Sequence, residues 1–217
     1  MLIHPWDAAQ DDAEWRAWLA SIEHFGMLAI PNLEPQAAPF LVPSHFTVAG
    51  DELLLHLARP NPVWPHLEAA REVRLALVGD VAYVPSYWRA AEGVPEEMGV
   101  PTSYYATVQF VCRPTIVDDA GGKAAILQAQ LDDVQPEGRH APMATDADPY
   151  GRMLPGIRGL RLQVLQVDAK FKYDDHKPVE FRERILGLLG ERGRRGAARQ
   201  QQRRLDAMGD WQAHRES

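Results

Sequence analysis

The stretch "TSYYATVQFVCRPTIV", residues 102–117, gives the strongest strand signal in this chain. β-branched and aromatic side chains dominate it, and such side chains fit the pleated, half-buried surface of a sheet. The run has no helical period, so it predicts one long β-strand. The elements on either side then decide which kind of sheet this strand belongs to.

Shorter apolar runs on both sides predict further strands, joined mostly by tight turns. They are a short strand that ends at Pro31, a hairpin over 37–58, two strands over 74–88 and an alternating strand over 157–173. Pro39 and Pro43 assign the first arm of the hairpin to an edge or a bulge, because proline offers no N–H to a neighbouring strand. The pair Gly79-Asp80 is the expected pivot between the two strands that follow.

Helices are fewer and scattered along the chain. The periodicity of apolar residues predicts them over 11–25, 63–73, 121–134 and about 178–189. Beyond residue 190 the chain is polar almost all round, which favours a solvated or partner-facing segment. Because strands outnumber helices and hairpins dominate, the predicted fold class is mainly β (α+β), an antiparallel barrel with peripheral helices. We expect a barrel domain over 1–178 and a C-terminal helix with an Arg-rich tail over 179–217.

Composition and charge narrow the classes of function. The 217 residues are 46% hydrophobic and 24% charged, as in an ordinary globular protein. The net charge of −7 argues against a protein that coats nucleic acid by charge alone, although the segment from Glu180 onward carries nine arginines against six acids. The single cysteine, Cys112, excludes an internal disulfide and favours a reduced intracellular setting. With no secretory signal and no run long enough to cross a bilayer, we expect a cytoplasmic protein with no membrane partner.

Several catalytic and cofactor motifs are missing from the sequence. The "GGKAA" stretch at 121–125 lacks the remaining residues of a phosphate-binding loop, and neither a G-x-G-x-x-G nor a G-x-S-x-G pattern occurs. His56 and His66 stand ten residues apart with Cys112 remote, so we predict no metal site. No residue stands out as a general acid or base, and no catalytic residue is assigned.

The stretch "HLARPNPVW", residues 56–64, is the candidate ligand site. Arg59 and Asn61 follow the end of an apolar strand, where a guanidinium and the amides that begin a helix are able to meet a phosphate. In a small barrel, Ser44 and His45 on the neighbouring strand lie beside His56. A flat cofactor ring has aromatic side chains to stack on, namely Trp64, Tyr83, Tyr87, Trp88, Tyr104 and Tyr105. The alternative is a tight strand-to-helix turn whose Arg and Trp pack on the surface.

Four motifs in order resemble the PaiB family, the FMN-binding negative transcriptional regulators. The first is His-x-Ala-Arg-x-Asn-Pro-x-Trp, matched by residues 56–64, which include Ala58. It is followed by "VAYVPSYW" at 81–88, by "VPTSYY" at 100–105 and by "GIRGLRLQVLQVDAKFK" at 156–172. The order and approximate spacing match across nearly the whole chain, from residue 1 to about 208.

The resemblance implies the FMN-binding split β-barrel, a homodimer with flavin in the groove between subunits. By this resemblance, Arg59 is the first candidate for a phosphate contact, and the other implied cofactor residues lie around the flavin. These are His56, Asn61, Ala58, Trp64, Ser44, His45 and Lys172, with Trp88 or Tyr105 reaching across from the other subunit. Where the family has Lys-x-Lys-Leu-Ser-Gln-Asn this chain has "KFKYDDHKP", so Asp174 and Asp175 add carboxylates that repel a nearby phosphate.

Three functions remain open at this point. The first is an FMN-binding regulator or sensor, in which the tail arginines are the candidate contact to DNA and the net charge opposes it. The second is a flavin-dependent oxidoreductase that acts on a small molecule through the cofactor's own reactivity. The third is a barrel that has lost its flavin and serves as a binding module. For the tail we favour a solvated helix or a disordered end over a DNA contact.

Overall fold

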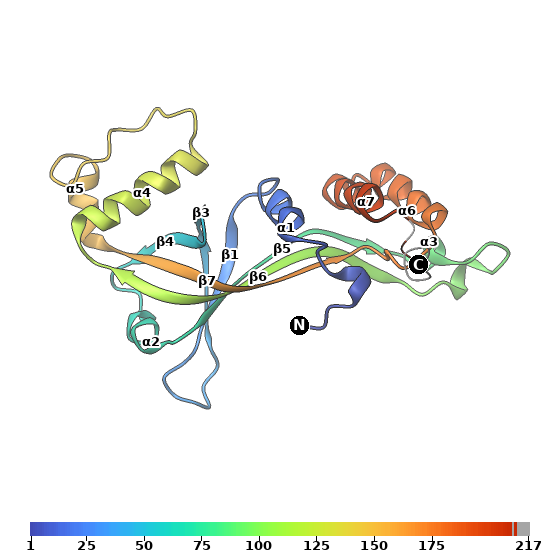
Figure 1. Ribbon diagram of the computed structural model, residues 1–217, viewed down its shortest axis with the longest axis horizontal. Helices are drawn as coiled ribbons and strands as arrows, with labels where there is room; N and C mark the ends of the chain where they lie inside the picture. The colour runs from blue at the N-terminus through green and yellow to red at the C-terminus, as the bar shows by residue number, and fades with distance from the viewer. Residues whose placement is uncertain (210, 212–217) are drawn as a thin grey trace. The chain divides into compact units, whose positions relative to one another are not determined.

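The computed structural model describes residues 1–209 and 211. Its strands form one seven-stranded sheet in the order β2-β1-β5-β6-β7-β4-β3 (Figure 1). The strands are β1 (Phe25–Ile30), β2 (Phe40–His45), β3 (Thr47–Ala49), β4 (Glu52–Ala58), β5 (Val73–Val84), β6 (Thr102–Val117) and β7 (Ile157–Lys172). The pairs β1–β2, β1–β5, β3–β4 and β4–β7 are antiparallel. The predicted class, an antiparallel split β-barrel with peripheral helices, is confirmed.

Helices connect and flank these strands. The α-helices are α1 (Asp12–Leu19), α2 (Trp64–Ala69), α3 (Ser86–Arg89), α4 (Ala120–Val134), α5 (Tyr150–Met153), α6 (Val179–Glu191) and α7 (Arg195–Met208). Single 3-10 turns are η1 (Pro5–Asp7), η2 (Glu96–Met98) and η3 (Leu154–Gly156). Among the described residues, no helix has the length and apolar character needed to span a membrane.

The strand predicted over 102–117 is β6, confirmed at both ends. The hairpin predicted over 37–58 is confirmed only at its turn. Phe46 interrupts the first arm, so β2 pairs with β1, while β3 alone pairs with β4. As the prolines predicted, β2 lies at one edge of the sheet.

The two strands predicted over 74–88 are one strand, β5, which ends at Val84, and residues 86–88 belong to helix α3, so that prediction is wrong. Asp80 has a left-handed backbone conformation, φ 50°, and inserts a bulge without ending the strand. The extra residue shifts the alternation of side chains: Leu75 and Leu77 are buried before it, and Ala82 and Val84 after it. In the sequence alone, this switch of the buried positions from odd to even residue numbers looks like a turn between two strands.

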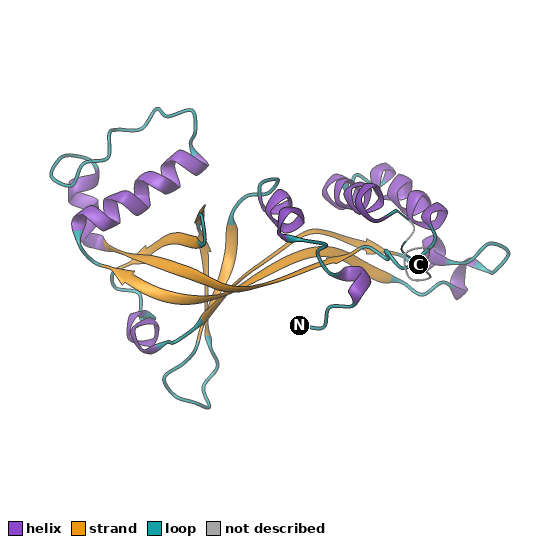
Figure 2. Ribbon diagram, in the orientation of Figure 1, coloured by secondary structure: helices purple, strands orange, loops and turns teal. Residues whose placement is uncertain are grey.

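The described chain packs into two compact units. Unit 1 comprises residues 1–22, 78–108 and 168–217, and unit 2 comprises 23–77 and 109–167. The long strands β5, β6 and β7, drawn as continuous ribbons in Figure 2, contribute residues to both units. Each unit has its own buried side chains, for example Trp18, Phe171 and Ile185 in unit 1 and Phe46, Leu55 and Phe110 in unit 2. The predicted division after residue 178 stays a prediction.

The C-terminal tail is an integral part of unit 1. Its residues 195–208 form α7, which packs beside α6 (Figure 1). One face of α7 is buried, and it consists of Ala197, Gln200, Gln201, Arg204 and Met208. The predicted solvated or disordered segment is therefore wrong for this face, because a buried ion-pair network replaces the apolar stripe that an amphipathic helix usually shows.

Candidate functional site

A cavity of about 380 Å³ lies in unit 2, between the strands and helix α4. Its lining residues are Glu23, His45, Phe46, His56, Leu127, Gln130, Leu131 and Val134. The last four are spaced i, i+3, i+4 and i+7 along α4, so they share one face of that helix. The cavity thus brings together two predicted cofactor residues, His45 from the end of β2 and His56 from the middle of β4.

The polar groups of this cavity form a short chain of hydrogen bonds. The Nδ1 atom of His56 lies 2.7 Å from Oε1 of Gln130. An amide oxygen only accepts, so His56 donates from Nδ1, and in the neutral ring its Nε2 is left as an acceptor. Nε2 of Gln130 donates in turn to the carbonyl of His45, at 3.5 Å. The side chain of His45 pairs with Glu23 at 3.2 Å.

Helix α4, the wall of the cavity, is fixed at both ends. At its start Asp119 accepts a hydrogen bond from the backbone N–H of Gly122, at 2.7 Å. Near its end the carboxylate of Asp133 lies 3.1 Å from Nδ1 of His24 and accepts a hydrogen bond of 3.0 Å from Thr47. The Asp119 bond caps the helix, and the contacts of Asp133 hold α4 against β3 and the segment before β1, so the cavity is preformed.

Ser44, the third predicted residue of this wall, is buried but does not line the cavity. Its hydroxyl has no hydrogen-bond partner within the described chain. Ser44 and His45 are consecutive on β2, and consecutive side chains of a strand point to opposite faces. Alternation along the strand therefore separates Ser44 from the histidine beside it.

Arg59 lies at the exit of β4 with a half-exposed side chain. Its Nε donates to the carbonyl of Pro155 at 2.7 Å, and its Nη2 donates to Asp118 at 2.5 Å and to the carbonyl of Ile157 at 3.4 Å. Asp118 also pairs with Nε of Arg158 at 3.0 Å. The hydrogen bond from Arg59, with the charge of Arg158, lowers the pKa of Asp118 below its ordinary value. One carboxylate is therefore shared by two guanidiniums.

Ala58, Asn61 and Trp64 build the turn after β4. The indole N–H of Trp64 donates to the carbonyl of Ala58 at 3.0 Å, and the side-chain oxygen of Asn61 accepts from the backbone N–H of Val63 at 3.2 Å. The guanidinium of Arg158 lies 4.8 Å from the centre of the Trp64 ring. The tight turn is therefore present, and within it Arg59 has a half-exposed side chain whereas Trp64 is buried.

Lys172 and Tyr105, two other predicted residues, lie together in unit 1. Nζ of Lys172 donates to Thr102 Oγ1 at 2.5 Å and to the carbonyl of Ser103 at 3.0 Å, and it lies 5.9 Å from the centre of the Tyr105 ring. Burial lowers the pKa of Lys172. Trp88 is placed elsewhere in this unit, buried on α3.

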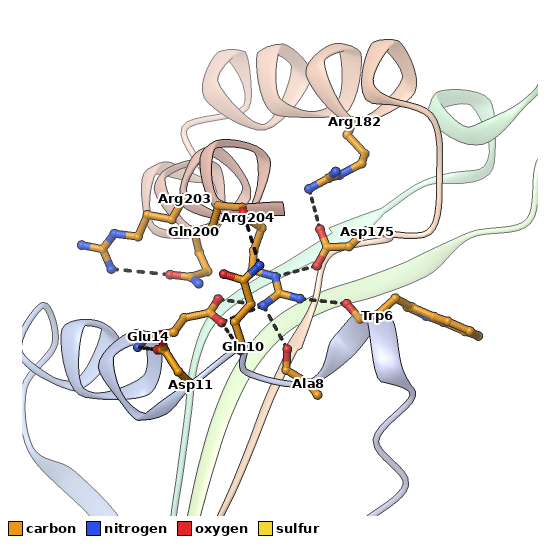
Figure 3. A network of polar contacts seen from close by, with 11 residues as sticks. Trp6, Ala8, Gln10, Asp11, Glu14, Asp175, Arg182, Gln200, Arg203 and Arg204 are labelled. Carbon is orange, nitrogen blue, oxygen red and sulfur yellow. Dashed lines mark hydrogen bonds and ion pairs between the residues drawn. The ribbon is translucent and has the colours of Figure 1, made fainter. Parts of the chain in front are cut away.

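The two carboxylates expected to repel a phosphate are both neutralised within unit 1. Asp174 pairs with Arg89 and accepts a hydrogen bond from the hydroxyl of Tyr104, at 3.0 Å. Asp175 lies between Arg182, at 2.7 Å, and Arg204, at 2.6 Å (Figure 3). Their charges are therefore compensated by guanidiniums, which weakens the repulsion expected from the sequence.

Residues 1–166 of this chain match the family described as "Putative FMN-binding domain". This chain belongs to that family. No curated protein matches it. The matched part contains β4, the cavity and the turn with Arg59, whereas α6 and α7 lie beyond it.

Solved structures share the fold of this FMN-binding domain at low sequence identity. The flavocytochrome Anf3 from Azotobacter vinelandii has a TM-score of 0.59 and 17% identity, covering 77% of this chain and 70% of that one. The FAD and heme binding protein from Mycobacterium smegmatis has a TM-score of 0.58 and 16% identity, covering 76% of this chain and 73% of that one. A "putative 5-nitroimidazole antibiotic resistance protein" from Bacteroides thetaiotaomicron has a TM-score of 0.57 and 14% identity, covering 75% of this chain and 85% of that one. At such identities the similarity shows the fold alone.

The residues of this FMN-binding domain fit the cofactor that its family implies. A volume of about 380 Å³ falls within the range of ligand sites, and an apolar wall with a few polar groups is typical of them. The mainly apolar wall suits a conjugated ring. Arg59 does not line this cavity; it lies three residues beyond His56 on the chain, and its half-exposed guanidinium suits a phosphate. FMN is accordingly the cofactor that this fold and family support.

Sequence reasoning missed several residues of this region. Gln130 and Asp133 lay in a segment predicted only as a helix, and polar residues on its buried face were the available signal. Asp118 directly follows β6, and Arg158 lies at the start of β7. Only the three-dimensional fold brings them to Arg59. Lys123 is buried and donates to the carbonyl of Leu154 at 2.6 Å, whereas the sequence showed it only as part of an incomplete phosphate-binding loop.

Proposed function

We propose that this protein is an FMN-binding sensor or negative transcriptional regulator of the PaiB type. The observation that carries the flavin part is the preformed cavity on His45 and His56, within the region that matches the FMN-binding family. The PaiB assignment and the regulatory role rest on the four sequence motifs. FMN, when bound, supplies one- and two-electron redox chemistry.

The side chains of the chain have distinct tasks in this proposal. His56, whose Nδ1 is bonded to Gln130, would present Nε2 to the bound flavin, and Leu127 and Leu131 would exclude water from the ring. Arg59 binds the phosphate, and the turn built by Asn61 and Trp64 fixes the backbone that carries it. Positioning and exclusion of water are thus the protein's contribution.

We propose further that the protein is a homodimer. In unit 1, Val78, Val81 and Tyr83 of β5 are 66%, 57% and 59% exposed. Large apolar side chains gathered on one strand favour association with another protein surface. A second copy of the chain would cover them and bring its own residues, such as Trp88 or Tyr105, toward a bound flavin. Sedimentation of the purified protein at several concentrations tests this.

A flavin-dependent oxidoreductase is the second candidate function. His45 and Val134, each exposed by about half or more, mark where the cavity reaches the surface, so a small molecule is able to enter it. Bleaching of the bound flavin by a nicotinamide donor, with turnover of an added acceptor, supports the oxidoreductase. A flavin that is reduced without turnover supports the sensor.

Titration of the flavin-free protein with FMN, followed by quenching of flavin fluorescence, tests the proposal. We expect Arg59→Ala to weaken FMN binding roughly 10- to 100-fold, the effect of losing a charge-assisted contact. Arg161→Ala is the matched control, since Arg161 is a similarly exposed, ion-paired arginine in the same unit. Equal FMN affinities for Arg59→Ala and Arg161→Ala would refute the phosphate assignment. Absence of FMN binding by the wild type would leave the barrel as a flavin-free binding module.

A further inference from the structure

Helix α7 carries a line of exposed arginines that the flavin site does not use. Arg195, Arg199 and Arg203 are spaced i, i+4 and i+8, so they form one stripe about 12 Å long on the helix surface. We call these three residues the arginine stripe. Between residues 192 and 203 the sequence has five arginines and no acid. The stripe is therefore a local cationic surface on an acidic protein.

The opposite face of α7 fixes the direction in which the stripe points. Arg204 is fully buried and donates to Asp175 at 2.6 Å, to Glu14 at 2.7 and 2.9 Å and to the carbonyl of Trp6 at 2.8 Å. Figure 3 shows Arg203, the preceding residue on the helix, extending away from this cluster. Because Arg204 is held from several sides, α7 has one rotational setting, and the stripe faces outward.

The charges of the stripe do not serve the stability of the helix. Arg194 and Arg195 stand at the start of α7, where the helix dipole opposes a cation, and neither caps the helix through its side chain. Like charges at i and i+4 also repel each other. Within the described part of the chain no acidic partner is found for Arg195 or Arg199, and Arg203 donates only to the neutral groups of Ser21 and Gln200. Such costs are typical of functional residues.

We propose that the arginine stripe binds the phosphate backbone of a nucleic acid. Guanidiniums bind phosphates through paired N–H donors. Successive stripe residues are separated by about 6 Å along the helix, close to the rise of about 6.8 Å for two nucleotides of one duplex strand. Such contacts position a protein on the duplex without reading its sequence. This inference deepens the regulatory role proposed above and rests on it, but because it concerns unit 1 it does not depend on whether FMN binds in unit 2.

Binding to a short fluorescent duplex DNA of mixed sequence, measured by anisotropy between about 50 and 200 mM salt, tests the proposal. Each phosphate contact accounts for a roughly 3.5-fold weakening over this range. We expect the triple variant R195Q/R199Q/R203Q to bind more weakly at low salt. The slope of log affinity against log salt should become shallower, its magnitude falling by about two to three. The lysine triple R195K/R199K/R203K should retain most of that slope, because it keeps the charges.

The matched control is R113Q/R152Q/R161Q, which lowers the net charge equally through two exposed arginines and one partly exposed arginine of unit 2. An unchanged slope for this control, with a reduced slope for the stripe variant, supports the proposal. Equal losses in the two variants would show a general charge effect and overturn it. The proposal would also be overturned if the wild type did not bind the duplex, or if it bound vesicles of anionic lipid without binding the duplex. Thermal unfolding and FMN titration of each variant show whether the fold and the flavin site are intact.

Discussion

Two carboxylates of this protein are each shared by two arginines, and they differ in burial. In unit 1, Asp175, Arg182 and Arg204 have no exposed side-chain surface. In unit 2, the side chains of Asp118 and Arg59 are each 44% exposed. The same chemical motif therefore occurs both inside the protein and at its surface.

This difference separates a structural role from a binding role. A buried charge without its partner is costly, so the cluster at Asp175 fixes three segments of unit 1 to one another. A half-exposed ion pair contributes little to stability, and water or another anion is able to replace either partner. If Arg59 binds the phosphate of FMN, as we propose, the phosphate has to compete with the carboxylate of Asp118.

The largest effect is expected from Asp175→Asn. The substitution leaves two buried guanidiniums without their counter-charge, and we expect it to lower the free energy of unfolding by about 3–5 kcal/mol. Urea denaturation followed by circular dichroism measures this change. A graded variant, Glu14→Gln, alters only one of the anionic partners of Arg204 and should cost about 1–2 kcal/mol.

If Asp175→Asn costs less than Glu14→Gln, the buried cluster is not what holds α6 and α7 in unit 1. An insoluble Asp175→Asn variant alongside a soluble, mildly destabilised Glu14→Gln variant agrees with the expectation. If neither variant is destabilised, the contrast between the two arginine pairs is wrong.

The sequence predicted the sheet well because its signal is local. The strand over 102–117 and the helix over 121–134 are confirmed almost to the residue, since propensity and periodicity act within each run. The bulge at Asp80 was mistaken for a turn, because both change the alternation of buried side chains. The tail was mistaken for a solvated segment, because Arg204 is buried only through distant partners such as Glu14.

The candidate site was predictable only in part, for a similar reason. His45 and His56 do line one cavity, but not as members of the predicted hairpin, because β2 pairs with β1 whereas β4 pairs with β3 and β7. Asp118 and Arg158 were missed because they approach Arg59 only through the folded sheet. A motif shows which residues occur together along the chain, whereas their charge partners come from tertiary structure.

A smaller effect is expected from Cys112, a buried group of unit 2 for which the described residues supply no charged partner. Burial raises the pKa of its thiol from an ordinary value of 9.0 to about 12. Between these pH values the unfolded chain releases a proton that the folded chain keeps, so the free energy of unfolding falls as the pH rises. We expect the wild type to lose about 1 kcal/mol more than Cys112→Ala between pH 8 and pH 10.

Urea denaturation of both proteins at the two pH values measures this difference. Burial also raises the pKa of Tyr104 and of Tyr173, so both proteins lose stability at alkaline pH, and only the difference between them reports on Cys112. Parallel losses would mean that the thiol is already accessible in the folded protein. Because Cys112 is uncharged at neutral pH, its burial is costly only on ionisation, unlike that of Asp175.

The smallest effect is expected from Asp118→Asn, which tests the Arg59–Asp118 pair at the surface most directly. Removing this carboxylate frees Arg59 for a phosphate, so we expect FMN to bind roughly twofold to fivefold more tightly, with a loss of stability below about 1 kcal/mol. Glu52→Gln, which breaks the similarly exposed pair with Arg161, should leave FMN binding unchanged. If Asp118→Asn weakens FMN binding as Arg59→Ala does, the carboxylate orients the guanidinium for the cofactor, and the pair is a fixed part of the site that a phosphate does not displace.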